Sequence, residues 1–363
     1  MSATAANSIQ EFSGRDAQRI RGEVLADKRP VILRKLVEEW PAVRLGRESA
    51  AALVRYLQRF DSGVPVDALL TAPEIDGKIF YDDTLSGFNF LRNRLPLTAV
   101  AEQVLRYAQF QRSPAVAAQS ALIRDCLPGF SLENPLNIVD DNVLPRIWLG
   151  SRITTPAHVD EWNNIGCVVA GRRRFTLFPP EQIDNLYIGP LDFAPTGAPM
   201  SLVPLEHPDF ERYPRFREAL ASAQSAELGP GDAIFIPPLW WHHVESLDSF
   251  NVLVNYWWHD LVGDGTRADS AFDALLHGLL SIRALPPQTR RAWAALFEHY
   301  VFGEQSEVVA HIPPARRGIL GVLSAQQLSE LRANLAKRLS RRRSGKDFER
   351  SLARLLQAIP RKR

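Results

Sequence analysis

The sequence predicts a mainly β core with α additions, built as a double-stranded jelly roll and followed by a C-terminal helical region. Two observations support this prediction. From Arg146 to Trp257, short apolar or alternating runs are separated by turn residues such as Gly171 and residues 229–232, which is typical of an antiparallel sandwich or barrel. After about Gly265 the apolar residues recur with the period of amphipathic helices.

Residues 1–112 mix short helices and strands, and we expect them to pack on the core as a lead-in region. Residues 30–33 are apolar and predict a buried strand, and residues 51–60 carry one apolar helix stripe. Residues 77–82 suggest a further strand, and a helix is predicted over 98–109.

Residues 113–264 form the predicted catalytic core. It begins with a short helix and a connection rich in Pro, Asn and Asp, and its predicted strands cover residues 146–149, 164–169, 174–178, 233–237 and 251–257. The interval 179–228 is too long for a hairpin turn, and residues 213–217 suggest a helical insertion within it. We expect this insertion to cover the mouth of a site.

Residues 265–363 form the predicted C-terminal helical region. Ser324 and Gln327 resemble a capping box at the start of one helix. Four apolar stripes fall in residues 272–282, 293–300, 328–339 and 348–359. Such stripes need a partner surface, either the sheet domain or a second copy of the chain, and we expect a homodimer.

Composition indicates an ordinary globular protein, with 45% hydrophobic and 23% charged residues among 363. The two cysteines, Cys126 and Cys167, form no disulfide framework, and no apolar run is long enough to cross a membrane. We therefore expect a cytoplasmic protein without membrane contact. Residues 332–363 contain twelve Lys/Arg against two Asp/Glu. This basic tail would attract nucleic acid or an acidic partner, although a solvated helical face is the simpler interpretation.

His158 and Asp160 supply two metal-ligand side chains to one face of an extended segment, because side chains two apart on a strand point the same way. A third ligand, His242, follows an apolar strand eighty-two positions after Asp160. Two histidines and one carboxylate form the facial triad of non-haem Fe(II) oxygenases. We predict an iron site of His158, Asp160 and His242, and a structural role for His243.

The segments around these residues resemble the JmjC family, in its cupin-8 branch of Fe(II)- and 2-oxoglutarate-dependent oxygenases. In order and spacing they are most similar to the asparaginyl hydroxylase of hypoxia-inducible factor, over about residues 145–258. The matching pieces are residues 148–150, 155–160, 171–180, 229–232, 237–244 and 255–257. The resemblance implies a cupin-like double-stranded β-helix with Fe(II) at one open end and with 2-oxoglutarate and O2 as cosubstrates.

The family's cosubstrate pocket matches residue positions in this chain. These positions are Thr155, Asn164, Arg173, Asn255, Trp257 and, from the lead-in region, Tyr81. Arg173 stands where family enzymes commonly have a lysine that binds the distal carboxylate of 2-oxoglutarate, and Arg172 or Arg174 are alternatives. A simple alignment places Phe80 at the family's tyrosine, with Tyr81 beside it.

By this resemblance the protein hydroxylates a protein side chain. N-methyl-lysine demethylation and small-molecule hydroxylation are alternatives that use the same chemistry, so the substrate is a protein, a peptide or a small molecule. A catalytically silent cupin used for binding or assembly is an alternative of another class, and a cupin enzyme without cosubstrate is a third. Binding of 2-oxoglutarate separates the first hypothesis from the last two.

Overall fold

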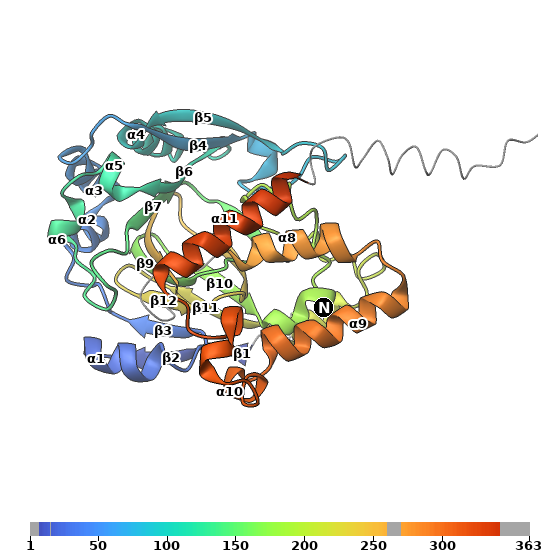
Figure 1. Cartoon of the computed structure of the whole chain (residues 1–363). Coiled ribbons are helices and arrows are strands. Elements are labelled where there is room, and N and C mark those ends of the chain that lie inside the picture. The colour runs from blue at the N-terminus through green and yellow to red at the C-terminus, as the bar shows by residue number, and fades with distance from the viewer. Residues whose placement is uncertain (1–6, 15, 260–269, 342–363) are drawn as a thin grey trace, which may run out of the picture. The chain divides into compact units, whose positions relative to one another are not determined.

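The computed structural model describes residues 7–14, 16–259 and 270–341. The chain divides into two compact units, residues 1–260 and residues 261–363 (Figure 1). The apolar stripe predicted over 348–359 and most of the predicted basic tail lie outside the described residues.

The first unit contains two β-sheets. The smaller sheet has the strand order β1-β11-β10-β13-β8, with β1 Asn7–Ser8, β11 Gln224–Leu228, β10 Arg173–Phe178, β13 Trp241–Ser246 and β8 Thr154–His158. The larger sheet has the order β2-β3-β12-β9-β14-β7-β6-β4-β5, with β2 Gln10–Ser13, β3 Val31–Arg34, β12 Ala233–Ile236, β9 Asn163–Ala170, β14 Asn251–Trp258, β7 Pro145–Gly150, β6 Ala115–Leu122, β4 Pro65–Thr71 and β5 Phe90–Pro96.

Eight consecutive strands, β7 to β14, form the predicted jelly roll. Four of them, in the order β12-β9-β14-β7, lie in the larger sheet, and the other four, in the order β11-β10-β13-β8, form most of the smaller sheet. All pairings within these two sets are antiparallel. Two four-stranded antiparallel sheets connected in this way are a double-stranded β-helix. The predicted fold class is therefore confirmed.

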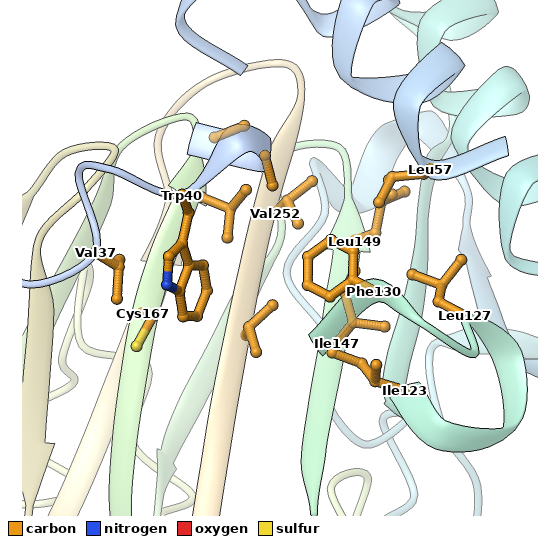
Figure 2. Packing of buried hydrophobic residues seen from close by; sticks show 14 of the residues in the cluster. Val37, Trp40, Leu57, Ile123, Leu127, Phe130, Ile147, Leu149, Cys167 and Val252 are labelled. Carbon is orange, nitrogen blue, oxygen red and sulfur yellow. The ribbon is translucent and has the colours of Figure 1, made fainter. Parts of the chain in front are cut away.

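Alternation along the central strands separates two apolar layers. On β9, Val168 faces the space between the sheets, whereas Cys167 faces the layer under the helices. All eight residues of β9 are buried because both faces of the larger sheet are covered. Figure 2 shows Trp40 and Phe130 in the outer layer, together with strand residues such as Ile147. Apolar side chains thus form the interior of the jelly roll, and the polar residues at the ends of its strands are left to form a binding site.

The helices of the first unit are α1 Ala17–Arg19, α2 Pro41–Glu48, α3 Ala50–Gln58, α4 Leu97–Tyr107, α5 Ile123–Cys126, α6 Phe130–Glu133 and α7 Phe216–Ser222, with a π-helix at Ile20–Val24 and short 3-10 helices at Pro73–Ile75 and Pro180–Asp184. Helices α1 to α6 contribute to the layer that contains Trp40 and Phe130, whereas α7 packs in a separate cluster with Phe178 and Trp241. The helices predicted over 51–60 and 98–109 correspond to α3 and α4. The predicted insertion contains α7.

The strand predicted over 77–82 is wrong. This segment forms only isolated bridges to Thr154 and Phe88. Its backbone bonds to β8 stop at Thr154, and the Asn89 side chain hydrogen-bonds the backbone of Lys78 and Phe80. Strands β4 and β5 of the lead-in region, and β6 at the start of the predicted core range, are absent from the prediction. β6 is rich in alanine, which gives little β signal, yet these strands extend the larger sheet beyond β7.

The second unit is helical over its described residues. Its helices are α8 Ala271–Ile282, α9 Pro287–Phe297, α10 Gln305–Val308 and α11 Ala325–Arg341, with a π-helix at Glu298–Phe302 and 3-10 helices at Pro314–Arg316 and Gly318–Leu320. The predicted capping box is confirmed, because the Gln327 amide N–H donates to Ser324 Oγ and the Ser324 N–H donates to Gln327 Oε1. Within the described ranges, no helix combines the length and apolarity that crossing a bilayer requires.

Candidate metal and cosubstrate site

His158 and His242 lie side by side at one end of the jelly roll. β8 and β13 are paired so that the two residues are direct partners, and their ring centroids are 4.1 Å apart. His158 Nδ1 lies 2.9 Å from the Pro156 carbonyl oxygen, and His242 Nδ1 lies 3.0 Å from the Trp240 carbonyl oxygen. A carbonyl accepts only from a protonated Nδ1, so each Nε2 carries the free lone pair.

The charge state of His158 also suits a metal ligand. Partial burial, together with the neighbouring His242 imidazole, lowers the pKa of His158 to about 4. The ring is therefore neutral at pH 7, and neutral imidazole is the form that binds metals.

Asp160 lies beside the two histidines and is the third potential metal ligand. His242 Nε2 is 3.5 Å from Asp160 Oδ2, and the potential ligand atoms of all three residues lie within 4.8 Å of one another. Two atoms that each lie about 2.1 Å from one ion are at most about 4.2 Å apart. The three side chains therefore need only a small adjustment to hold one ion, and their nitrogen and carboxylate donors fit Fe(II).

A chain of hydrogen bonds orients the Asp160 carboxylate. Trp148 Nε1 donates to Asn255 Oδ1 at 2.9 Å, and Asn255 Nδ2 donates to Asn164 Oδ1 at 3.2 Å. Asn164 Nδ2 then donates to Asp160 Oδ2 at 3.3 Å. Asn164 and Asn255 line the cavity, as the resemblance implied. Their amides also connect the larger sheet to the carboxylate, which the sequence did not indicate.

Of the three consecutive arginines at 172–174, Arg173 lines the cavity that contains the potential metal ligands. Its side chain is buried, with 8% of the residue exposed, and among the described residues its Nε has no hydrogen-bond acceptor. Arg172 and Arg174 are instead paired with surface carboxylates. Their partners are Asp248, Glu227 and Glu245. Alternation sets Arg173 apart from its two neighbours, and the packing of β10 turns the face of Arg173 toward the cavity, which decides between the three arginines that the sequence left open.

A cavity of about 250 Å³ connects these groups. Thr155 and Trp257 line it, and the Trp257 Nε1 is a second buried donor that has no acceptor within the part of the chain that the structure describes. Burial lowers the pKa of Arg173 to about 10, so the guanidinium remains charged at pH 7. A buried cation and an unpartnered N–H suit a ligand that only accepts hydrogen bonds, such as a dicarboxylate. The cavity therefore fits 2-oxoglutarate as well as a metal ion.

Tyr81 is not brought to this cavity. It is buried elsewhere, and its hydroxyl donates to the Phe193 carbonyl oxygen at 2.6 Å. Its ring packs against Phe80, Phe88 and Phe193. His243, the neighbour of His242, is 2% exposed and lies outside the group that could hold a metal.

Comparison with protein families matches residues 17–264 to the family described as cupin-like domain. The chain belongs to this cupin-like family. The match covers most of the chain and includes every residue of the candidate site, so the family that the sequence motifs indicated is confirmed.

Relatives of this cupin-like protein include enzymes named as demethylases. Human HSPB1-associated protein 1 is 36% identical over 149 residues, which cover 40% of this chain and 30% of that protein. Lysine-specific demethylase JMJ31 of Arabidopsis thaliana is 38% identical over 114 residues, or 31% of this chain and 20% of that protein. Lysine-specific demethylase 8 of Xenopus tropicalis is 26% identical over 249 residues, or 66% of this chain and 50% of that protein. The chain thus spans between a fifth and a half of these curated relatives.

The mouth of the cavity in this cupin-like protein contains residues that the sequence did not single out. They come from strands β4, β5 and β6 and from the insertion, and they are Asp67, Arg92, Gln119, Ser120, Thr196 and Gly197. No local motif marks them, because they meet only when β4, β5 and β6 extend the larger sheet. The pairing of β6 with β7 shifts register between Ala118 and Ala121, and no pattern in the sequence indicated this irregularity.

Proposed function

We propose that this protein is an Fe(II)- and 2-oxoglutarate-dependent oxygenase that hydroxylates a protein side chain. One observation carries the proposal: a group of two histidines and one aspartate shares a cavity with the unpaired, buried Arg173. A silent cupin has no need for a buried cation without a counter-ion, because such a charge costs stability.

Each residue of the site has a role in this proposal. His158, Asp160 and His242 would hold Fe(II), and the two backbone carbonyls at their Nδ1 atoms fix which nitrogen is offered. Arg173 would neutralise the distal carboxylate of 2-oxoglutarate, and the apolar walls exclude water from it. With both groups bound, O2 and 2-oxoglutarate are converted to succinate and CO2 while one oxygen atom enters a C–H bond of the substrate.

Demethylation of N-methyl-lysine is the alternative that the names of two relatives raise. An aromatic cage is one way to bind a methylated ammonium group. The two tryptophans that line the cavity already face other groups, because their rings lie edge to face with centroids 6.2 Å apart and the Arg146 guanidinium lies 5.7 Å from the Trp257 ring centroid. This observation supports hydroxylation over demethylation, and small-molecule hydroxylation remains within the same chemistry.

The test of the proposal is succinate formation by the purified chain under air with Fe(II), ascorbate and 2-oxoglutarate. We expect slow turnover without added substrate, and its loss in the His158→Ala/Asp160→Ala variant. Calorimetric titration of metal-loaded protein with 2-oxoglutarate should show saturable binding. Absence of both turnover and binding would refute the oxygenase and favour the silent or cosubstrate-free cupin.

We also propose that the C-terminal helices form a homodimer. Among the described residues of the second unit, apolar core burial is confined to Val308 and Val309. Large apolar side chains on its helices are exposed, including Leu280 at 84% and Phe302 at 71%. A helical region without a core of its own needs a partner surface. Sedimentation should give twice the chain mass, and Leu280→Glu with Phe302→Glu should give a monomer with unchanged 2-oxoglutarate binding. A monomeric wild type would refute the dimer.

From its charge, we also propose that the basic tail contacts nucleic acid. Such contact predicts strongly salt-dependent RNA or DNA binding that deletion of residues 340–363 abolishes. Binding that survives the deletion would contradict it.

A further inference from the structure

Residues 193–200 of the insertion, named here the entrance strap, are attached at one end to the strand that carries His158. Met200 forms an antiparallel bridge with His158, and the next residue, Ser201, donates its N–H to the Ala157 carbonyl oxygen at 2.7 Å. Met200 and Ser201 are fully buried. This end of the strap is therefore part of the metal-site framework.

The other end of the strap is attached to the lead-in region by its backbone carbonyls. Tyr81 donates its hydroxyl to the Phe193 carbonyl oxygen at 2.6 Å, and Arg92 Nη2 donates to the Pro195 carbonyl oxygen at 2.7 Å. The Phe193 ring also stacks on Phe88, with centroids 4.8 Å apart and planes 15° apart. Burial raises the pKa of Tyr81, which keeps its hydroxyl protonated as a donor.

The middle of the strap forms part of the cavity wall. Thr196 and Gly197 line the cavity that contains the metal-ligand group. A turn shapes this part, because the Gly197 N–H donates to the Ala194 carbonyl oxygen at 3.1 Å and Gly197 has a φ of +76°. The strap thus runs from Tyr81 and β5 to β8 and closes one side of the mouth.

We propose that Tyr81 and Arg92 are positioning residues that hold the entrance strap and set the width of the opening to the site. The Arg92 guanidinium also lies 5.9 Å and 5.6 Å from the ring centroids of Phe88 and Phe90. The guanidinium therefore interacts both with the Pro195 carbonyl of the strap and with these two rings. The substrate that passes the opening is that of the proposed oxygenase, so this part of the inference rests on the proposed function.

Amide hydrogen exchange tests the strap without requiring activity. Tyr81→Phe removes one hydrogen bond, and we expect exchange over residues 190–200 to be about fivefold faster. Arg92→Met removes a charged donor, and we expect about tenfold or more. Tyr56→Phe is the matched control, because it removes a buried tyrosine hydroxyl bonded to Glu133 elsewhere in the lead-in region. Exchange over 190–200 that stays at the wild-type rate in both strap variants would overturn the proposal.

Titration with 2-oxoglutarate separates a positioning role for Tyr81 from the cosubstrate-binding role that the family resemblance implied. For metal-loaded Tyr81→Phe we expect a Kd within twofold of the wild type, whereas Arg173→Met should lose binding. A tenfold weaker Kd for Tyr81→Phe with unchanged exchange would assign Tyr81 to the cosubstrate and overturn our inference. If the wild type binds no 2-oxoglutarate, the proposed function fails, and the exchange experiment still decides whether the strap is held as described.

Discussion

Replacement of Arg173 by methionine should stabilise the ligand-free protein while it destroys cosubstrate binding. Burial lowers the pKa of this guanidinium from its ordinary 12.5 to about 10. Since a tenfold change in acidity corresponds to about 1.4 kcal/mol, the buried charge costs the folded chain about 3 kcal/mol. The cost is present at every pH below about 10, because the group is charged in both states there. Methionine removes the charge and keeps a flexible apolar side chain in the same space.

The variant should be more stable than the wild type without ligand, and this difference should nearly vanish when ligand is present. Without 2-oxoglutarate, Arg173→Met should raise the melting temperature by about 5 °C or more, because 1 kcal/mol corresponds to about 2 to 4 °C in a unit of this size. With Fe(II) under nitrogen and 2-oxoglutarate at 100 times its Kd, the wild type should gain about 2.7 kcal/mol, and the variant should gain nothing.

Differential scanning calorimetry measures both effects on the same samples. Arg172→Met is the matched control, because Arg172 is paired with Asp248 and Glu227 on the outer face. It should lower stability slightly and leave the response to 2-oxoglutarate intact. If Arg173→Met destabilises the ligand-free protein and still responds to 2-oxoglutarate, the argument from an uncompensated charge is refuted.

Three further predictions concern the framework of the site. Asn164→Ala should weaken Fe(II) binding about tenfold, because the Asp160 carboxylate loses its orienting donor; an affinity within twofold of the wild type in anaerobic titration would contradict this. Burial lowers the pKa of His243 to about 3, whereas histidine in the unfolded chain titrates near 6.5. The unfolded state then binds more protons, so from pH 7 to pH 5 this imidazole should remove about 2 kcal/mol of unfolding free energy from the metal-free protein. Urea unfolding of His243→Phe should show a smaller loss of unfolding free energy over this pH range. A loss equal to that of the wild type would refute the lowered pKa of His243. Gly171→Ala should cost about 2 kcal/mol or more, since Gly171 has a φ of +70° and an added Cβ would lie 2.6 Å from the Phe250 carbonyl oxygen; a loss under 0.5 kcal/mol by urea unfolding would contradict this.

Local patterns were enough to predict the jelly roll and the candidate metal ligands. Alternation and turn residues mark a strand within a few positions, and the spacing of two between His158 and Asp160 predicted a shared face on an extended segment, although β8 ends at His158 and Asp160 lies just beyond it. His242 was predicted from the apolar strand that leads into it. The structure brings these three residues together because β8 and β13 pair in the register that opposes His158 and His242.

Other features depend on contacts between distant segments, which a local pattern does not encode. Arg173 differs from its two neighbours because carboxylates more than fifty positions away pair with Arg172 and Arg174. Tyr81 follows a strand-like pattern, yet its hydroxyl meets a carbonyl 112 positions later, in the insertion. The sequence by itself therefore determined which residues could bind a metal and which strands carry them. Only the tertiary structure decided which cation remains unpaired and what surrounds the entrance, because both depend on which side chains the packed sheets and the insertion bring into contact.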